Sequence, residues 1–302
     1  MQEDFRYADL LDDDVFKLVF GQESSKEVMI EFLNQVIDDR NIVDLEFMDK
    51  EMRSMDREKK NSVYDMFCKT DDGSRIVVEV QRRKQKSYVE RTIYYSTFQV
   101  RNQVDAGSGD YSFCPVYVIN ILDFNINENK GIPDVKTVYR LYQENRHTLL
   151  TDRLTFIFIE LNKFNKGLSE LNGNILDGIY FCLKNMSIMK ECPKELDYGV
   201  FRKMFNMSEL VNMDEVTRSK VLLKMTTERD LRNQMEYARQ EAIEEGRATG
   251  HAAGLAAGLA AGHAEGKAEA TLDNARKLKA LGVDASIISQ ATGLDIKEIE
   301  NL

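Results

Sequence analysis

The chain has 302 residues, 43% of them hydrophobic, and a formal net charge of −10. This length allows one large domain or two ordinary ones, each with a sizeable core. The acidic balance argues against a protein that coats nucleic acid with its whole surface, although a local basic region could still bind phosphates.

The lack of a recognisable targeting signal and the pattern of cysteines favour a cytoplasmic protein. The first residues are acidic and lack an apolar stretch, and no run of about 18 apolar residues occurs. We therefore expect neither a signal peptide nor a membrane span. The cysteines are scattered without a Cys-x-x-Cys pair, which favours reduced thiols over disulfides or zinc ligation; they are Cys68, Cys114, Cys182 and Cys192.

The first predicted elements are two helices. In residues 10–20, Phe16, Val19 and Phe20 recur at helical spacing after the acidic triplet Asp12 to Asp14. Capping and complementation of the helix dipole are the simplest interpretation of that triplet. Gly21 breaks the segment, and Ser24 or Ser25 is expected to cap a second helix over residues 26–38.

A β-hairpin is the strongest signal in the following part of the chain. Residues 42–48 alternate like a half-exposed strand, and the charged residues 50–60 predict a loop or an extended hairpin. Residues 62–70 and 75–82 are rich in β-branched and aromatic residues and flank Asp72-Gly73, as in a hairpin. Further elements are expected in this order: a helix over 88–105, strands over 114–124, 137–143 and 154–161, and helices over 170–187, 194–206 and 209–225. This order predicts an α/β fold, a mixed sheet with helices packed on it.

Polar residues interrupt the second strand of this hairpin. Side chains alternate faces along a strand, so Glu79 and Gln81 point the same way. A turn near Asp72-Gly73 places Asp65 opposite residues 79–81. Two buried carboxylates cost several kcal/mol each unless a partner offsets the charge. A divalent cation would be such a partner, and a structural hydrogen-bonded network is the alternative.

Six glycines recur every four residues in the C-terminal third, within residues 246–266; they are Gly246, Gly250, Gly254, Gly258, Gly262 and Gly266. On a helix this step forms one stripe, along which two backbones can approach closely. Each glycine costs a lone helix about 1 kcal/mol relative to alanine. We therefore expect this helix to self-associate and the protein to be a homo-oligomer, with a flexible linker or an unrelated packing face as the alternatives.

The last residues predict two short helices, over 284–292 and 295–302, arranged like a helix–turn–helix pair. Basic residues are scarce there, which favours a protein-interaction or capping role over DNA reading. The whole chain then divides into three parts: residues 1–225, the glycine-repeat segment 226–281, and a small helical tail over 282–302.

Several motifs in a fixed order resemble those of the PD-(D/E)XK nuclease family transposases, a group related to recombination-promoting nucleases. Asp65 precedes a Glu-x-Gln motif by fourteen positions, and a helix follows. The flanking motifs agree in type and order over roughly residues 10–125; they are Asp13-x-x-Phe16-Lys17-x-x-Phe20-Gly21, Phe32-Leu33-Asn34, Val78-Glu79-Val80-Gln81 and Arg91-x-x-Tyr94-Tyr95.

The resemblance implies a restriction-endonuclease-like αβββαβ core and Mg²⁺-dependent DNA cleavage, with Mn²⁺ as a possible substitute. Asp65 and Glu79 would be metal ligands, with the Val80 carbonyl as a third and Asp13 as a further acid of the site. Gln81 occupies the position of the motif's lysine. An amide can orient a water but brings no charge, so Lys17 or Arg91 is expected to supply the missing cation.

A basic segment follows the hairpin. Six basic residues stand against the single acid Glu90 in residues 81–101, a local net charge of +5. Such a segment can hold phosphates, although a solvated loop is the competing interpretation. The expected DNA-binding residues are Lys17, Arg82, Arg83, Lys84, Lys86 and Arg91.

Two functions remain open from the sequence. One is a metal-dependent DNA endonuclease that serves recombination, mobile-element activity or phage defence. The other is a catalytically inactive nuclease-fold module that binds nucleic acid or protein. The intact pair of Asp65 and Glu79 favours the enzyme, because a degenerate copy would often lose one carboxylate.

Overall fold

The computed structural model describes residues 5–48, 51–52, 62–105, 107 and 109–302. Contacts between residues divide the chain into two compact units, Met1–Thr226 and Thr227–Leu302. The finer division into residues 1–225, 226–281 and 282–302 stays a prediction.

A mixed sheet forms the centre of the first unit, with its strands in the order β1-β4-β5-β6-β8-β7. Neighbouring strands β5, β6 and β8 run parallel, whereas β4 and β7 pair antiparallel with β5 and β8. The bounds are β1 Leu45–Phe47, β4 Met66–Thr70, β5 Arg75–Gln81, β6 Val116–Leu122, β7 Lys136–Tyr142 and β8 Leu149–Glu160. The expectation of an α/β fold with a mixed sheet is confirmed.

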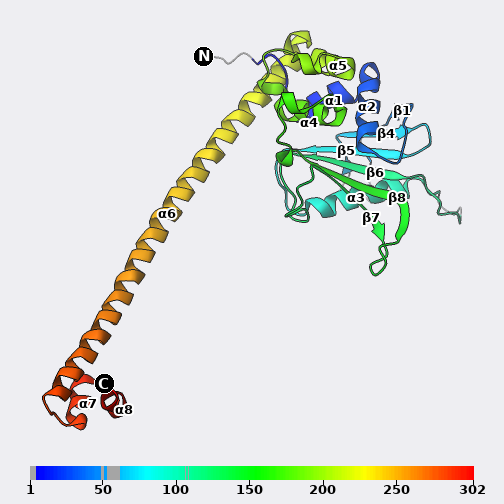
Figure 1. Cartoon of the computed structure of the whole chain (residues 1–302). Helices are drawn as coiled ribbons and strands as arrows, with labels where there is room; N and C mark the ends of the chain where they lie inside the picture. The colour runs from blue at the N-terminus through cyan, green and yellow to red at the C-terminus, as the bar shows by residue number, and fades with distance from the viewer. Residues whose placement is uncertain (1–4, 49–50, 53–61, 106, 108) are drawn as a thin grey trace. The chain divides into compact units, whose positions relative to one another are not determined.

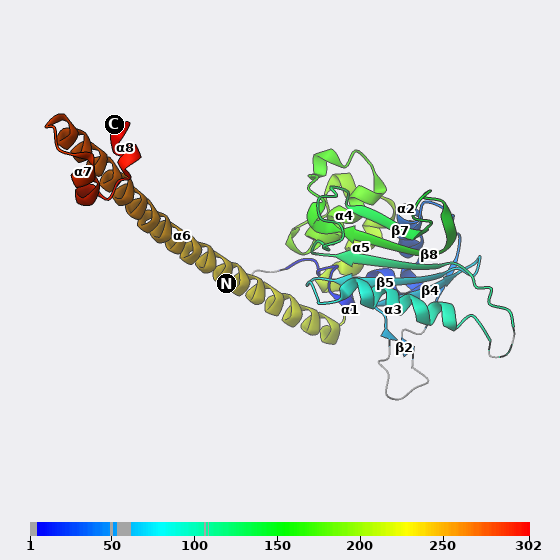
Figure 2. The ribbon, with the colours of Figure 1, turned by 90° about the horizontal axis from the view of Figure 1, so that it is seen from below.

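Helices cover both faces of this sheet (Figures 1 and 2). Helices α1, α2, α4 and α5 share one hydrophobic core with Ile76, Val78 and Val80 of β5. On the opposite face, Val77 packs in a cluster with residues of α3. Alternation along β5 therefore supplies both cores. The bounds are α1 Asp13–Phe20, α2 Lys26–Val36, α3 Tyr88–Arg101, α4 Ile175–Asn185 and α5 Gly199–Ser208.

The predicted hairpin consists of β4 and β5, with Met66 opposite Val78 in an antiparallel register. Its turn is fixed by Asp72, whose Oδ1 accepts hydrogen bonds from Ser74 N (2.9 Å) and Thr70 Oγ1 (2.6 Å). Gly73 adopts φ +84°, a conformation that favours glycine. In the preceding segment, β2 (Glu51–Met52) pairs with β3 (Ser62–Val63). The rest of the loop predicted over 50–60 lies outside the described residues.

The predicted first or last residue of several helices was wrong, because local polar contacts make these helices begin or end elsewhere. Helix α3 ends at Arg101 rather than residue 105; beyond it, Gln103 Oε1 accepts from Cys114 N (2.8 Å) and ties the chain back toward β6. Helix α4 begins at Ile175 rather than residue 170, because Asn174 caps it. Likewise, α6 begins at Glu215 rather than 209, where Asp214 Oδ1 accepts from Val216 N and Thr217 N.

Helix α6 spans Glu215–Ala280, and two short helices follow it, α7 (Ala285–Thr292) and α8 (Ile296–Glu300). Ile288 and Ile299 pack with Ala275 near the end of α6 in a small core of the second unit. The two predicted short helices are thus confirmed. In the described part of the chain, no helix combines the length and apolar character needed to cross a membrane.

Candidate active site

Two carboxylates meet at the carboxyl end of β5. Asp65 lies directly before β4, and the antiparallel register places it beside Glu79. Asp65 Oδ2 accepts a hydrogen bond from the Val80 backbone amide at 2.8 Å. Residues 65 and 79 thus face each other across the hairpin, held together by strand pairing rather than by a loop.

Glu79 is a buried acid without a full set of partners. Glu79 is only 6% exposed. Among the described residues, its Oε1 has no hydrogen-bond partner. Burial, and then the neighbouring charge of Asp65, raise the pKa of Glu79 to about 8. Burial also raises the pKa of Asp65, although the Val80 amide and Lys17 oppose this shift. At neutral pH the pair therefore retains a proton.

Another buried glutamate shows what a satisfied carboxylate is like in this protein. Glu160, at the end of β8, is 0% exposed. It accepts from Ile126 N at 2.8 Å, and from Asn129 Nδ2 and Lys163 Nζ at 2.6 Å each. Glu79 lacks such a set of donors. Its unpaired oxygen beside Asp65 offers hard oxygen ligands of the kind that Mg²⁺ and Mn²⁺ prefer, so these residues fit a divalent cation.

Cationic side chains reach the carboxylates from both helical layers. From α1, Lys17 Nζ lies 3.7 Å from Asp65 Oδ1 and 3.7 Å from Asp13 Oδ2. From α3, Arg91 donates to Gln81 Oε1 at 3.0 Å, and its guanidinium stands 4.9 Å from the ring centroid of Tyr88. The acid pair is thus bordered by one cation from each side of the sheet.

The contact with Arg91 also fixes the orientation of the Gln81 amide. A guanidinium only donates hydrogen bonds, so the amide oxygen of Gln81 must face Arg91. The amide nitrogen of Gln81, a donor, is left for other acceptors. Gln81 therefore presents the same hydrogen-bonding polarity as the lysine that the motif usually carries.

Asn120 is a residue of this region that the sequence reasoning missed. It is fully buried on β6, directly beside Glu79 in the parallel register. Its Oδ1 accepts from Tyr88 Oη at 2.9 Å and from Thr92 Oγ1 at 3.0 Å, which anchors the first turns of α3 to the sheet. A single polar residue within the apolar strand 116–122 was the available signal, of the same kind as Glu79 in β5.

The basic residues expected to bind DNA have different surroundings. Arg82 is 14% exposed, forms an ion pair with Asp9 (3.0 Å) and donates to the Leu11 carbonyl. Lys84 donates to Asn127 Oδ1 at 2.6 Å. Arg83 and Lys86 are exposed on the same loop. Arg82 therefore contributes to packing, and the exposed positive charge lies further along the loop.

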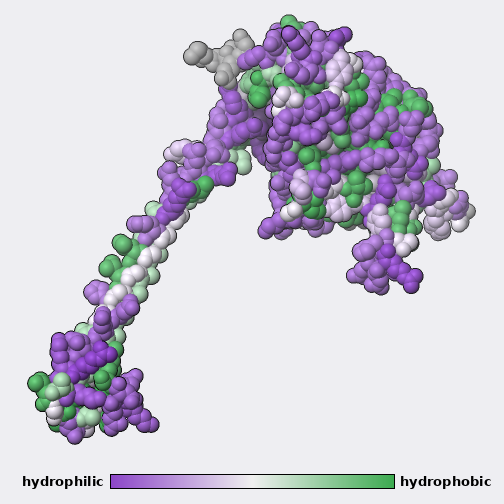
Figure 3. All heavy atoms as spheres, in the orientation of Figure 1, coloured by the Kyte–Doolittle hydropathy of each residue, from purple (hydrophilic) through white to green (hydrophobic). Residues whose placement is uncertain are grey.

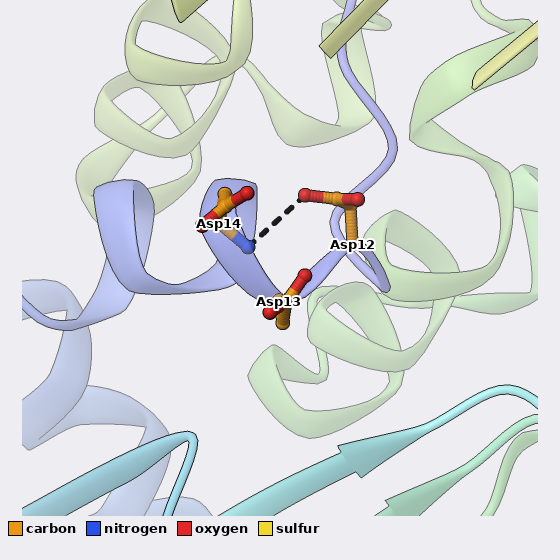
Figure 4. A group of neighbouring side chains, drawn as sticks. All are labelled: Asp12, Asp13 and Asp14. Carbon is orange, nitrogen blue, oxygen red and sulfur yellow. Dashed lines mark hydrogen bonds between the residues drawn. The ribbon is translucent and has the colours of Figure 1, made fainter. Parts of the chain in front are cut away.

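The acidic triplet at the start of α1 has distinct roles for its members. Asp12 is the N-cap, since its Oδ1 accepts from Asp14 N (3.0 Å) and Val15 N (3.2 Å). Carboxylate oxygens of the three residues lie within 4.8 Å of one another, close enough to hold a metal ion (Figure 4). Lys224 already forms ion pairs with this cluster, at 2.5 Å from Asp14 and 3.0 Å from Asp13.

A family model described as PD-(D/E)XK nuclease family transposase matches residues 10–238. The matched range contains the acid pair, both bordering cations and the helices that carry them, and it extends well beyond residues 10–125. No curated protein and no solved structure matches the chain.

Proposed function

Since this chain belongs to the PD-(D/E)XK nuclease family transposases, we propose that it is a metal-dependent endonuclease that hydrolyses phosphodiester bonds of DNA. The observation that carries the proposal is the buried, incompletely paired Glu79 beside Asp65. Recombination, mobile-element activity or phage defence are the processes in which such an enzyme would act.

Asp65 and Glu79 would hold the divalent cation, Mg²⁺ or Mn²⁺, with the Val80 carbonyl as a third ligand. When bound, the cation neutralises phosphate oxygens and acidifies a water molecule. The Val80 amide keeps Asp65 in place through its 2.8 Å hydrogen bond, so one ligand is preorganised. Glu79 must lose its proton before it can bind a cation, because only the carboxylate is a ligand.

Gln81 and Arg91 together replace the lysine of the motif in this proposal. Arg91 holds the amide oxygen of Gln81, at 3.0 Å, and directs the amide nitrogen toward an acceptor such as a phosphate oxygen or the attacking water. The guanidinium supplies the positive charge that an amide lacks. This pair therefore orients and stabilises rather than abstracts a proton.

Lys17 supplies a second positive charge, beside Asp65. Its ammonium group lies between Asp65 and Asp13, at 3.7 Å from each. Asp13 is bound to Lys17 and Lys224, and we propose that it acts on the site through Lys17. In this proposal Asp13 positions Lys17 and does not serve as a further acid of the metal site.

DNA would be held by the loop that follows β5. Arg83, Lys84 and Lys86 lie directly after Gln81 along the chain, within a few residues of the acid pair. Lys17 and Arg91 complete the basic set, and Arg82, half-buried against Asp9, supports the start of the loop. Contacts from such residues to phosphates position a duplex without reading its sequence.

Self-association through residues 246–266 of α6 completes the proposal. Among the described residues, nothing lies within 4 Å of a Cβ built on any of the six repeat glycines. In Figure 3 the middle of α6 is white and green, between purple hydrophilic stretches. Leu255 and Leu259, next to these glycines, are 61% and 58% exposed. A second copy of the helix would cover this face.

A plasmid-nicking assay with and without Mg²⁺ tests the function. We expect the wild-type chain to cut only with the metal, and Asp65→Asn and Glu79→Gln to lose at least about a hundredfold in rate. Asp44→Asn is the control, because Asp44 is exposed and its carboxylate contacts Lys26 and the Leu45 backbone amide rather than a residue of the proposed site. Cutting by both site variants at the wild-type rate would refute the proposal. A wild-type chain that binds DNA without cutting it would favour the inactive binding module instead.

A further inference from the structure

We propose that Lys224 is a positioning residue for the active site, because it holds Asp13 and so leaves Lys17 beside Asp65. The inference rests on the proposed function, since it concerns the cation next to a proposed metal ligand. It assigns a role in the reaction to a residue of α6, which lies 159 positions after Asp65 in the sequence.

Asp13 is shared between two lysines. Lys224 Nζ contacts Asp13 Oδ1 at 3.0 Å, and Lys17 Nζ lies 3.7 Å from Asp13 Oδ2. A charge-assisted hydrogen bond between an ammonium and a carboxylate is usually about 2.7–2.9 Å long. Asp13 is therefore bound more closely to Lys224 than to Lys17.

Lys17 is balanced between two carboxylates. Its distances to Asp13 and Asp65 are equal, at 3.7 Å. Asp13 and Lys17 are four residues apart on α1, so a change of side-chain rotamer is enough to bring them into full contact. Lys17 stays between the two acids because Asp13 already pairs with a closer cation, Lys224.

The fold holds Lys224 firmly in this position. Val221 and Met225, beside it on α6, are 1% and 6% exposed and belong to the main core of the first unit. Lys224 also contacts Asp12 and Asp14, at 3.2 and 2.5 Å. These two acids sit at the start of α1 (Figure 4). The ammonium group is thus fixed by its helix and by three carboxylates.

Loss of Lys224 has a defined consequence. Asp13 would then have Lys17 as its nearest cation, and Lys17 would move toward Asp13 and away from Asp65. Asp65 would lose a competing positive charge, so a divalent cation would bind there more tightly. At the same time the site would lose the charge that Lys17 contributes to the reaction. Metal affinity and rate therefore change in opposite directions, whereas general damage to the fold would lower both.

The test measures Mn²⁺ affinity by electron paramagnetic resonance and DNA cleavage at saturating Mn²⁺. We expect Lys224→Met to bind Mn²⁺ about fivefold more tightly and to cleave about tenfold more slowly. Lys17→Met should tighten binding similarly, and the double variant should bind no more tightly than either single one. Lys220→Met is the matched control: Lys220 lies one turn earlier on α6 and pairs with Asp14, so it should change neither quantity.

A second substitution separates positioning from a structural role. Asp13→Asn in the Lys224→Met background removes the carboxylate that draws Lys17 away, so the cleavage rate should recover. Additive effects of Lys17→Met and Lys224→Met on Mn²⁺ affinity, or no recovery of rate with Asp13→Asn, would overturn the inference. If Asp65→Asn and Glu79→Gln bind Mn²⁺ as the wild type does, the proposed metal site itself is refuted, and the role of Lys224 with it.

Discussion

Replacing Glu79 with glutamine should stabilise the folded protein at neutral and alkaline pH in the absence of divalent cations. The pKa of Glu79 rises from 4.5 to about 8 on folding, chiefly through burial. Between these values the folded state keeps a proton that the unfolded state releases. Stability therefore falls as pH rises through this window and levels off above about 8.

The size of this effect follows from the shift. Each pKa unit corresponds to about 1.4 kcal/mol, so the wild type should lose roughly 3 kcal/mol by pH 7 and up to roughly 5 kcal/mol above pH 8. Glutamine carries no such proton, and the variant should lack this pH dependence. Near pH 4.5 the two proteins should have similar stability.

Denaturant unfolding in EDTA, followed by tyrosine fluorescence, measures this difference. The chain has no tryptophan, and all of its twelve tyrosines except Tyr237 lie in residues 1–226. The contrasting control is Glu160→Gln, which breaks the 2.6 Å ion pair with Lys163 and should cost about 3–5 kcal/mol. Added Mg²⁺ should stabilise the wild type and leave Glu79→Gln unchanged.

Parallel pH profiles for wild type and Glu79→Gln would refute the reasoning. They would mean that Glu79 ionises normally in the folded protein and that its burial is compensated. The electrostatic argument for a cation between Asp65 and Glu79 would then fail as well.

Three further predictions concern the site, the basic loop and the core. Arg91→Ala should lower the single-turnover cleavage rate about tenfold to a hundredfold, because it removes the guanidinium charge beside Gln81; an unchanged rate would mean that Gln81 acts alone. Lys86→Ala should reduce the magnitude of the slope of log K against log salt in DNA-binding titrations by about 1, whereas an identical slope would exclude a phosphate contact there. Gly178→Ala should destabilise the first unit by about 1–3 kcal/mol in thermal unfolding, because a Cβ would lie 2.5 Å from Phe201 Cζ; wild-type stability would show that Phe201 can move aside.

Local patterns in the sequence were sufficient for most of the fold. β-branched residues beside an Asp-Gly turn identified β5, and alternation placed Glu79 and Gln81 on one face, because side chains of a strand face opposite sides wherever the strand lies. The apolar spacing of residues 10–20 located α1, and glycine and aspartate located the hairpin turn. The predicted ends of the helices were less accurate, because side-chain contacts such as that of Gln103 with Cys114 depend on where distant segments lie.

The sequence by itself determined that two acids and an amide share one face of a hairpin, because residue spacing and strand alternation are local properties. Only the tertiary structure decided what surrounds them. Burial under α3 and beside β6 raises the pKa of Glu79, and packing brings Lys17, Arg91 and Lys224 to their places. It also turns Arg82 inward, onto Asp9. Desolvation and contacts between distant residues arise only when helices and strands pack together, and no periodicity in the sequence encodes them.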